Sequence, residues 1–177
     1  ERLCHGAYPV MEQNGLIFAY MGPPDRVPPL LKIDSFEVPG TYYAVAAKVF
    51  IPCNWLQLND NSPDIFHLRY LHTLATGPQF GASLGLPSES NWIETDFGIT
   101  AFDTRRVRDK IWVRLDDIIL PNMVQGAPVF EEGKEEKRLM LPDFFAWHVP
   151  VNDTNSLGFF LIRWPEGEEI TEDRKVA

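Results

Sequence analysis

Cysteine is scarce in this sequence. Among 177 residues only Cys4 and Cys53 occur, and they form no C-x-x-C pair. Two cysteines do not make a disulfide scaffold, and this spacing excludes the common zinc and dithiol redox motifs. We therefore expect a protein with two free thiols, and the cytoplasm is the compartment that keeps thiols reduced.

Long apolar runs and an excess of basic residues are also missing. The longest apolar runs, such as 16–21 and 157–162, fall well short of the roughly 18 residues that a membrane span needs. Twenty-five acidic residues against 16 basic ones give a net charge of −9. This balance argues against a nucleic-acid partner and against an anionic membrane surface. With 45% hydrophobic residues, the chain has enough apolar material for a packed core.

The sequence also lacks an initiator methionine and a basic-then-apolar leader. It begins at Glu1 and stops at Ala177 without a helix cap or an anchoring motif. From these ends we expect a piece of a longer protein.

The first part of the chain is typical of short strands. Two apolar runs flank Asn14-Gly15, and Asn-Gly is a strong hairpin signal. Four prolines within 23–29 indicate a stiff connector and a possible domain boundary. The aromatic and β-branched segment 42–51 predicts a strand.

The segment 54–73 differs, because its apolar residues recur at helical spacing. Pro63 would break a continuous helix but suits the first turn of a new one. The sequence therefore predicts a short helix, a break near 61–62 with Asn61 or Ser62 as N-cap, and a second helix over about 63–72.

The remainder predicts strands again. A loop over 74–90 precedes them, and its three glycines and two prolines are typical of a mobile or functional segment. The charged run 131–138 suits a solvated loop. The remaining segments have strand character: 92–104, 111–115 after a turn at 108–109, and 144–151 and 157–164 joined by 152–155. We expect one strand-rich domain with a helical interruption.

One set of residues in the second helix suggests metal chemistry. Asp64, His67 and His72 follow the spacing Asp-x-x-His-x-x-x-x-His. Two histidines with a carboxylate suit non-haem Fe(II) and O₂ chemistry, and a carboxylate three residues before a histidine can take the second ring N–H. The two histidines lie five residues apart, which places them about 140° apart on a regular helix. They can share a metal only if the helix ends or distorts between them; otherwise they are packed or surface residues.

Residues 53–73 resemble the mononuclear-iron helix of the Rieske-type non-haem iron oxygenases. These are the large subunits of aromatic-ring-hydroxylating dioxygenases and aromatic O-demethylases. The segment most resembles the branch of the family that acts on phthalate- and vanillate-like compounds. The family pattern is Asn-Trp, then an acidic or amide pair, then Asp-x-x-His-x-x-x-x-His. Further segments of the chain resemble the family's strands: 8–10, 15–23, 94–95, 98–99, 105–106, 112–114, 120–122 and 149–154.

The resemblance implies an α+β fold in which a curved antiparallel sheet grips helices, the helix-grip or START-like arrangement. It implies that His67 and His72 bind Fe(II), that Asp64 bonds His67 and relays electrons, and that Asn61 is a polar neighbour of the iron. The electrons would come from a [2Fe–2S] Rieske cluster in a neighbouring subunit of a trimer. The implied partners are O₂, an aromatic substrate, and a reductase or ferredoxin.

Two expected parts are missing from this sequence. The family's cluster ligands, Cys-x-His and Cys-x-x-His, are not found, and Cys4-His5 matches neither. The third iron ligand is an aspartate that we expect after Ala177, because Asp153 belongs to an earlier motif and Asp173 has no motif support. The expected organisation is the end of a Rieske domain in 1–22, a connector in 23–40 and an incomplete catalytic domain in 41–177. Such a piece should bind iron weakly and be inactive alone.

Several other residues admit two interpretations. His148 suits a hydrogen-bonded strand position or a pocket wall, and Arg105 and Arg106 suit a substrate carboxylate or a solvated strand edge. The 74–90 loop suits a lid. Six aromatic residues suit either a substrate pocket or the core: Trp112, Phe144, Phe145, Trp147, Phe159 and Phe160.

Two functions of different classes are consistent with the sequence. The first is an oxygenase that hydroxylates or O-demethylates an aromatic compound. The alternative is a metal-free pocket that binds an apolar small molecule. A binding module would have no need of Asp64, His67 and His72 together, so we favour the oxygenase.

Overall fold

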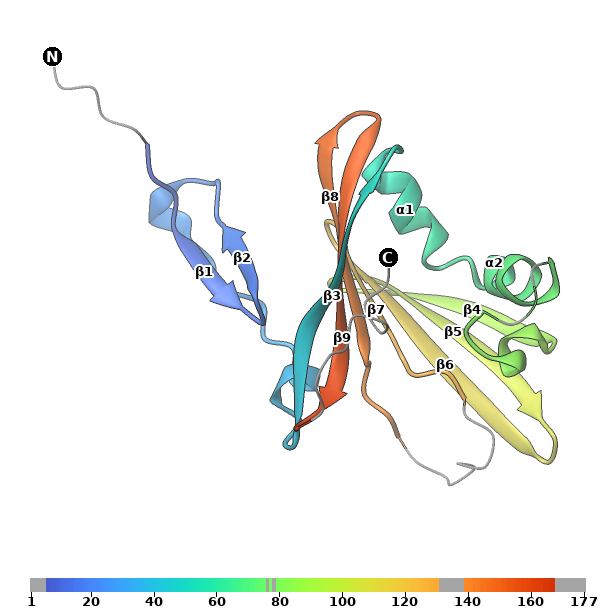
Figure 1. The fold of residues 1–177 in the computed structure, drawn as a ribbon. Helices are drawn as coiled ribbons and strands as arrows, with labels where there is room; N and C mark the ends of the chain where they lie inside the picture. The colour runs from blue at the N-terminus through green and yellow to red at the C-terminus, as the bar shows by residue number, and fades with distance from the viewer. Residues whose placement is uncertain (1–5, 76, 78, 131–138, 168–177) are drawn as a thin grey trace, which may run out of the picture.

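The structure is a computed structural model that describes residues 6–75, 77, 79–130 and 139–167. A hairpin, β1–β2, forms a separate two-stranded sheet, and seven further strands form one antiparallel sheet in the order β3-β9-β8-β7-β6-β5-β4 (Figure 1). Cys4, His5, Asp173 and the charged run 131–138 lie outside the described residues.

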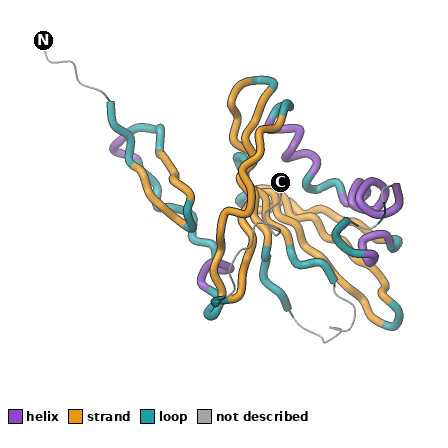
Figure 2. The backbone as a smooth tube through the Cα atoms, in the orientation of Figure 1, coloured by secondary structure: helices purple, strands orange, loops and turns teal. Residues whose placement is uncertain are grey.

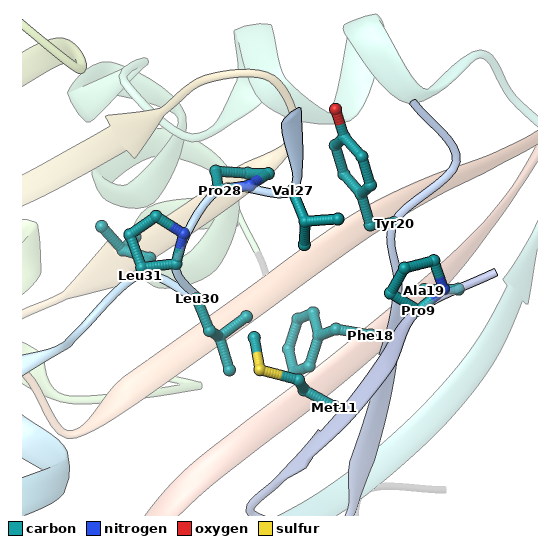
Figure 3. Close-up of a pocket in the computed structure, with 10 residues that line it drawn as sticks. Pro9, Met11, Phe18, Ala19, Tyr20, Val27, Pro28, Leu30 and Leu31 are labelled. Atoms are coloured by element: carbon teal, nitrogen blue, oxygen red, sulfur yellow. The ribbon is translucent and has the colours of Figure 1, made fainter. Parts of the chain in front are cut away.

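The hairpin joins β1 (Val10–Gln13) to β2 (Leu16–Ala19). Asn14 and Gly15 form its turn with φ of 52° and 77°, the left-handed conformations that a type I′ turn requires. The predicted hairpin is therefore confirmed. The proline-rich connector that follows contains two short 3₁₀ turns, η1 (Pro24–Arg26) and η2 (Asp34–Glu37). An apolar groove separates Val27–Leu31 from the hairpin (Figure 3).

The large sheet confirms most of the predicted strands and adds to them. The segment 92–104 divides into a hairpin, because Gly98 (φ 153°) starts a new strand after a turn at 96–97. Arg108 (φ 57°) lies in the predicted turn at 108–109. The strand bounds are β3 Thr41–Ile51, β4 Ser88–Thr95, β5 Gly98–Val107, β6 Lys110–Ile119, β7 Met123–Gly126, β8 Phe144–Asn152 and β9 Asn155–Pro165.

The helical segment is broken where the sequence predicts a break. Helix α1 spans Trp55–Asn61 and α2 spans Ile65–Arg69. A π-helical turn, η3 (Tyr70–Ala75), continues α2, and a 3₁₀ turn, η4 (Ala82–Gly85), follows. The predicted N-cap of the second helix is wrong: Asp64 caps it, because its carboxylate accepts from two free N–H groups of the first turn.

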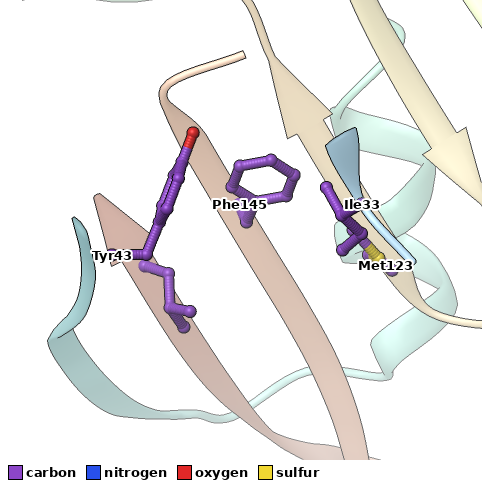
Figure 4. Close-up of a cluster of buried hydrophobic side chains, with 5 residues drawn as sticks. Ile33, Tyr43, Met123 and Phe145 are labelled. Carbon is purple, nitrogen blue, oxygen red and sulfur yellow. The ribbon is translucent and has the colours of Figure 1, made fainter. Parts of the chain in front are cut away.

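The two faces of the large sheet are covered differently. Helices α1 and α2 lie along one face, whereas the hairpin and connector lie on the other (Figures 1 and 2). A cluster of Ile33, Tyr43, Met123, Phe145 and Leu161 fills the connector side (Figure 4). On the helix side Ile118, Val124 and Ala146 pack with Phe144 and Phe160.

The architecture is therefore the predicted α+β fold, with a large curved antiparallel sheet and helices on one face. None of the helices in the described part of the chain is long and apolar enough to cross a lipid bilayer.

Candidate metal centre

The break between α1 and α2 positions the first candidate ligand. Oδ1 of Asp64 accepts hydrogen bonds from the backbone N–H groups of Phe66 (3.1 Å) and His67 (3.3 Å). These bonds satisfy donors that a helix start leaves free. The Asp64 carboxylate thus caps the start of α2 and fixes the position from which the His67 side chain projects.

The His67 ring is held from both of its nitrogens. Nδ1 donates to the main-chain carbonyl of Asp64 in a short hydrogen bond, and Nε2 lies 3.4 Å from Nδ2 of Asn61. The sequence predicts that the Asp64 carboxylate bonds the His67 ring. In the structure the main-chain carbonyl of Asp64 takes that place, because the carboxylate is used to cap the helix. Burial lowers the pKa of His67, which favours the neutral ring that binds metals.

The His72 ring is held by a residue that the sequence analysis does not single out. Nδ1 of His72 lies 2.5 Å from Oε1 of Gln79, and the backbone N–H of Gln79 donates to the carbonyl of His72 (3.0 Å). The Phe80 ring packs on the imidazole with centroids 5.0 Å apart. A glutamine in a Gly- and Pro-rich loop has no motif that would mark this role. Only its place soon after His72 suggests it.

The π turn brings the two histidines together. Their rings meet edge to face, with centroids 5.2 Å apart and planes at 74°. For metal–nitrogen bonds of roughly 2.1 Å, two imidazoles on one ion have centroids roughly 4.6–5.3 Å apart. With both Nδ1 atoms engaged, Nε2 is the nitrogen of each ring that is left for a metal, and Nε2 of His67 also has the Asn61 amide 3.4 Å away. The predicted helix distortion is present, and the separation of the two rings is one that a shared ion would give.

A cavity of about 280 Å³ adjoins the histidine pair. Its walls come from α1, α2 and the helix side of the sheet, and they combine apolar and charged residues. The lining residues are Ile51, Leu58, Asn61, Ser62, His67, Leu68, His72, Phe80, Arg114, Asp116, Asp117, Val124, Gln125, Gly126, Phe144, His148 and Phe160.

The aromatic residues divide between the cavity and other surroundings. Phe144 and Phe160 line the cavity, with ring centroids 6.0 Å apart. Phe145 belongs to the core on the opposite face, and Trp147 packs against that core and against Phe18. The other two lie elsewhere: Phe159 beside Lys48 and Trp112 beside Arg105.

Charged residues pair with one another on the helix side of β5 and β6. Arg114 binds the carboxylate of Asp116 and donates from Nε to the carbonyl of Ala127 (3.1 Å). Burial raises the pKa of Asp116 to about 6.

Arg105 and Asp103 form a second ion pair, with side chains 0% exposed. Burial lowers the pKa of Arg105 to about 10. Arg105 is therefore not at a solvated strand edge, whereas Arg106 is exposed.

His148 occupies a hydrogen-bonded strand position, which is one of the two interpretations that the sequence allows. Its Nδ1 lies 2.8 Å from Oδ1 of the buried Asn59. Burial lowers the pKa of His148 to about 4, so the ring is neutral at physiological pH. It is 5% exposed and also lines the cavity.

Within the described residues, no third ligand joins His67 and His72. No three His, Cys, Asp or Glu side chains of this part of the chain are grouped so that they could hold a metal ion. Asp153 lies in the turn between β8 and β9, and its carbonyl accepts from Asn54 of the α1 cap (2.9 Å).

No protein-family model matches the chain. It is 36% identical, over 90% of its length, to the oxygenase subunit of a tert-butanol monooxygenase / tert-amyl alcohol desaturase from Aquincola tertiaricarbonis, and covers 36% of that protein. It is 29% identical, over 88% of its length and 40% of the relative, to a phenoxybenzoate dioxygenase alpha subunit from Ectopseudomonas oleovorans. The 5,5'-dehydrodivanillate O-demethylase oxygenase subunit of Sphingobium sp. (strain NBRC 103272 / SYK-6) is 29% identical over 92% of the chain and 36% of the relative.

Solved structures share the fold at low identity. Dicamba monooxygenase bound to 3,6-dichlorosalicylic acid superposes with a TM-score of 0.63 and 18% identity, over 88% of this chain and 50% of that one. The fluorene-bound oxygenase of carbazole 1,9a-dioxygenase, in a ferredoxin complex, gives a TM-score of 0.55 and 18% identity over 95% and 49%. A quaternary ammonium Rieske monooxygenase gives 0.52 and 18% over 95% and 44%.

The fold is that of the catalytic domain of Rieske oxygenases. The chain is homologous to the oxygenase subunits of Rieske-type ring-hydroxylating and O-demethylating systems, which confirms the resemblance stated from residues 53–73. These relatives support the interpretation of the sequence as an oxygenase over the alternative of a metal-free pocket that binds an apolar small molecule. The chain spans less than half the length of these curated relatives.

Proposed function

We propose that this chain is the iron-bearing catalytic part of a Rieske-type non-haem iron oxygenase that hydroxylates or O-demethylates an aromatic compound with O₂. The observation that carries the proposal is the histidine pair: the rings of His67 and His72 are 5.2 Å apart, and each holds its Nδ1 in a hydrogen bond. Such bonds fix the tautomer that presents Nε2 to a metal.

His67 and His72 would hold Fe(II) through Nε2, with an aspartate after Ala177 as the third ligand. Two histidines and one carboxylate leave positions open on the ion, and Fe(II) bound in this way supplies O₂ activation. Asn61, whose amide lies 3.4 Å from Nε2 of His67, would be the polar neighbour of the ion.

The chain's own residues prepare the site for this chemistry. The Asp64 carboxylate holds the start of α2 and has the charge for an electron relay from a cluster toward His67. Phe144, Phe160 and Phe80 give the cavity apolar walls, which suit a flat aromatic ring and limit the access of water. The chain thus binds and orients a substrate beside the histidine pair.

The domain organisation follows from the same proposal. Residues 1–22 would be the end of a Rieske domain with a [2Fe–2S] cluster, 23–40 the connector and 41–177 the catalytic domain. In support, β1 and β2 form their own sheet, apart from the seven strands (Figure 1). The loop 74–90 would act as a lid, because it leaves directly from His72.

The proposed partners are an aromatic substrate, O₂, and a ferredoxin or reductase that delivers electrons, with a trimer as the working assembly. The ferredoxin complex of the carbazole 1,9a-dioxygenase oxygenase, whose fold this chain shares, supports an electron-carrier partner.

Iron content tests the proposal. In the full-length protein, His67→Ala and His72→Ala should each lose most of the mononuclear iron, whereas His148→Gln should keep it. The last variant is the matched control, because His148 lines the same cavity but lies outside the pair. Equal iron in all variants would overturn the assignment of the ligands.

A further inference from the structure

The protonation of His148 is fixed by a chain of hydrogen bonds from α1 to the sheet. Nδ2 of Asn59 donates to the carbonyl of Pro121 (2.9 Å), so the amide oxygen of Asn59 is the atom that faces His148. That oxygen can only accept, and it lies 2.8 Å from Nδ1 of His148. The proton of the neutral ring therefore sits on Nδ1, and Nε2 carries a lone pair.

The lone pair on Nε2 of His148 is available to a hydrogen-bond donor in the cavity. Among the residues that the structure describes, Nε2 of His148 has no hydrogen-bond partner, and the ring lines the cavity beside the histidine pair. Burial lowers the pKa of this ring to about 4, so it stays neutral. An unprotonated ring nitrogen of this kind is a hydrogen-bond acceptor for a donor in the cavity.

The cation on the cavity wall is already neutralised within the protein. Arg114 binds Asp116 and donates to the carbonyl of Ala127. Its position is tight, because a Cβ added at Gly126 would lie 2.7 Å from Oδ1 of Asp116 and 3.0 Å from Nη2 of Arg114. The pair contributes no net charge, so this wall gives a carboxylate little attraction.

We propose that Nε2 of His148 accepts a hydrogen bond from a hydroxyl group of the substrate, so that this cavity selects neutral hydroxylated molecules over carboxylates. The inference rests on the proposed function and names the substrate class of the same site. The hydroxyl would donate to His148, and the apolar body would lie between the aromatic walls. A cavity of about 280 Å³ suits a single ring with small substituents.

Equilibrium binding of three small probes to the full-length protein tests this inference without turnover. Phenol carries the hydroxyl, toluene replaces it with a methyl group of similar size, and benzoate carries a charge. The ratio of the toluene Kd to the phenol Kd should fall about tenfold in His148→Leu, as one hydrogen bond predicts. His148→Gln keeps a side-chain carbonyl as an acceptor and should retain most of the ratio. An unchanged ratio in His148→Leu, or tighter binding of benzoate than of phenol to the wild type, would overturn the inference.

A second measurement covers the case in which His148→Leu does not fold. In the ¹⁵N spectrum of the wild-type zinc-loaded protein, the Nε2 resonance of His148 should shift with phenol and not with toluene; the same response to both would overturn the inference. Iron content separates this result from the proposed function. If His67→Ala and His72→Ala keep their iron, the oxygenase proposal fails whatever the probes show.

Discussion

The imidazole rings of His67 and His72 meet edge to face at 5.2 Å, although four residues stand between them in the chain. A π turn bonds residue i to residue i+5, so residues five apart come to lie on one face of the helix. The η3 turn (Tyr70–Ala75) provides this geometry after the α-helical α2. The distortion is therefore what brings the two rings together.

The hydroxyl of Thr73 supports the π turn. It donates to the carbonyl of Leu68, five residues earlier, at 3.2 Å, and the residue is buried. Thr73→Val keeps the shape but removes this bond, which we expect to cost about 1 kcal/mol and to weaken Co(II) binding about tenfold. Thr73→Ser, which keeps the hydroxyl, should bind Co(II) like the wild type. Faster amide exchange over 70–75 in the valine variant alone would place the loss of stability in the π turn. Identical Co(II) affinity in both variants would contradict the supporting role of the Thr73 hydroxyl.

The hydrogen bond between Gln79 and His72 should tune metal affinity. Gln79→Leu removes the acceptor that fixes the His72 tautomer, and the loss of such a partner typically costs 10–100-fold in metal affinity. Gln79→Glu keeps an acceptor and should bind as tightly as the wild type or more tightly. Calorimetric titration with Co(II) measures both. Equal affinity of the leucine variant and the wild type would mean that the bond between Oε1 and Nδ1 does not matter for the metal.

Two roles of Asp64 can be separated by substitution. Asp64→Ala removes the helix cap and should lower the free energy of unfolding by about 1 kcal/mol. Asp64→Asn caps equally well, and the carbonyl that holds His67 is unchanged, so its stability and iron content should match the wild type. Under the proposed function, however, it should transfer electrons to the iron much more slowly, because the charge is lost. Urea unfolding, iron analysis and single-turnover kinetics distinguish these outcomes, and a normal electron-transfer rate in Asp64→Asn would exclude the relay role.

Local signals in the sequence predict the hairpin at Asn14-Gly15 and the helix break well, because turn chemistry and proline act within a few residues. The same signals miss the cap at Asp64, since Asn61, Ser62 and Asp64 are all good caps and only the path of the chain selects one. They also miss Gln79, whose partner is set by how the loop folds back. The burial of Arg105 depends on Asp103 and on the packing of the sheet, which no local pattern records.

Asp116 and His148 should make stability depend on pH with opposite signs. Burial raises the pKa of Asp116 from 3.8 to about 6, so the folded state binds more protons between these values and stability falls as pH rises. Burial lowers the pKa of His148 from 6.5 to about 4, so the folded state binds fewer protons there and stability falls as pH drops. Each effect is on the order of 2–3 kcal/mol, so in the metal-free wild type the two largely cancel. Urea unfolding at pH 4, 5 and 6.5 should show Asp116→Asn losing stability steeply on acidification and His148→Gln gaining it. Parallel profiles for both variants and the wild type would mean that neither group titrates between pH 4 and 6.5 in the way its burial requires.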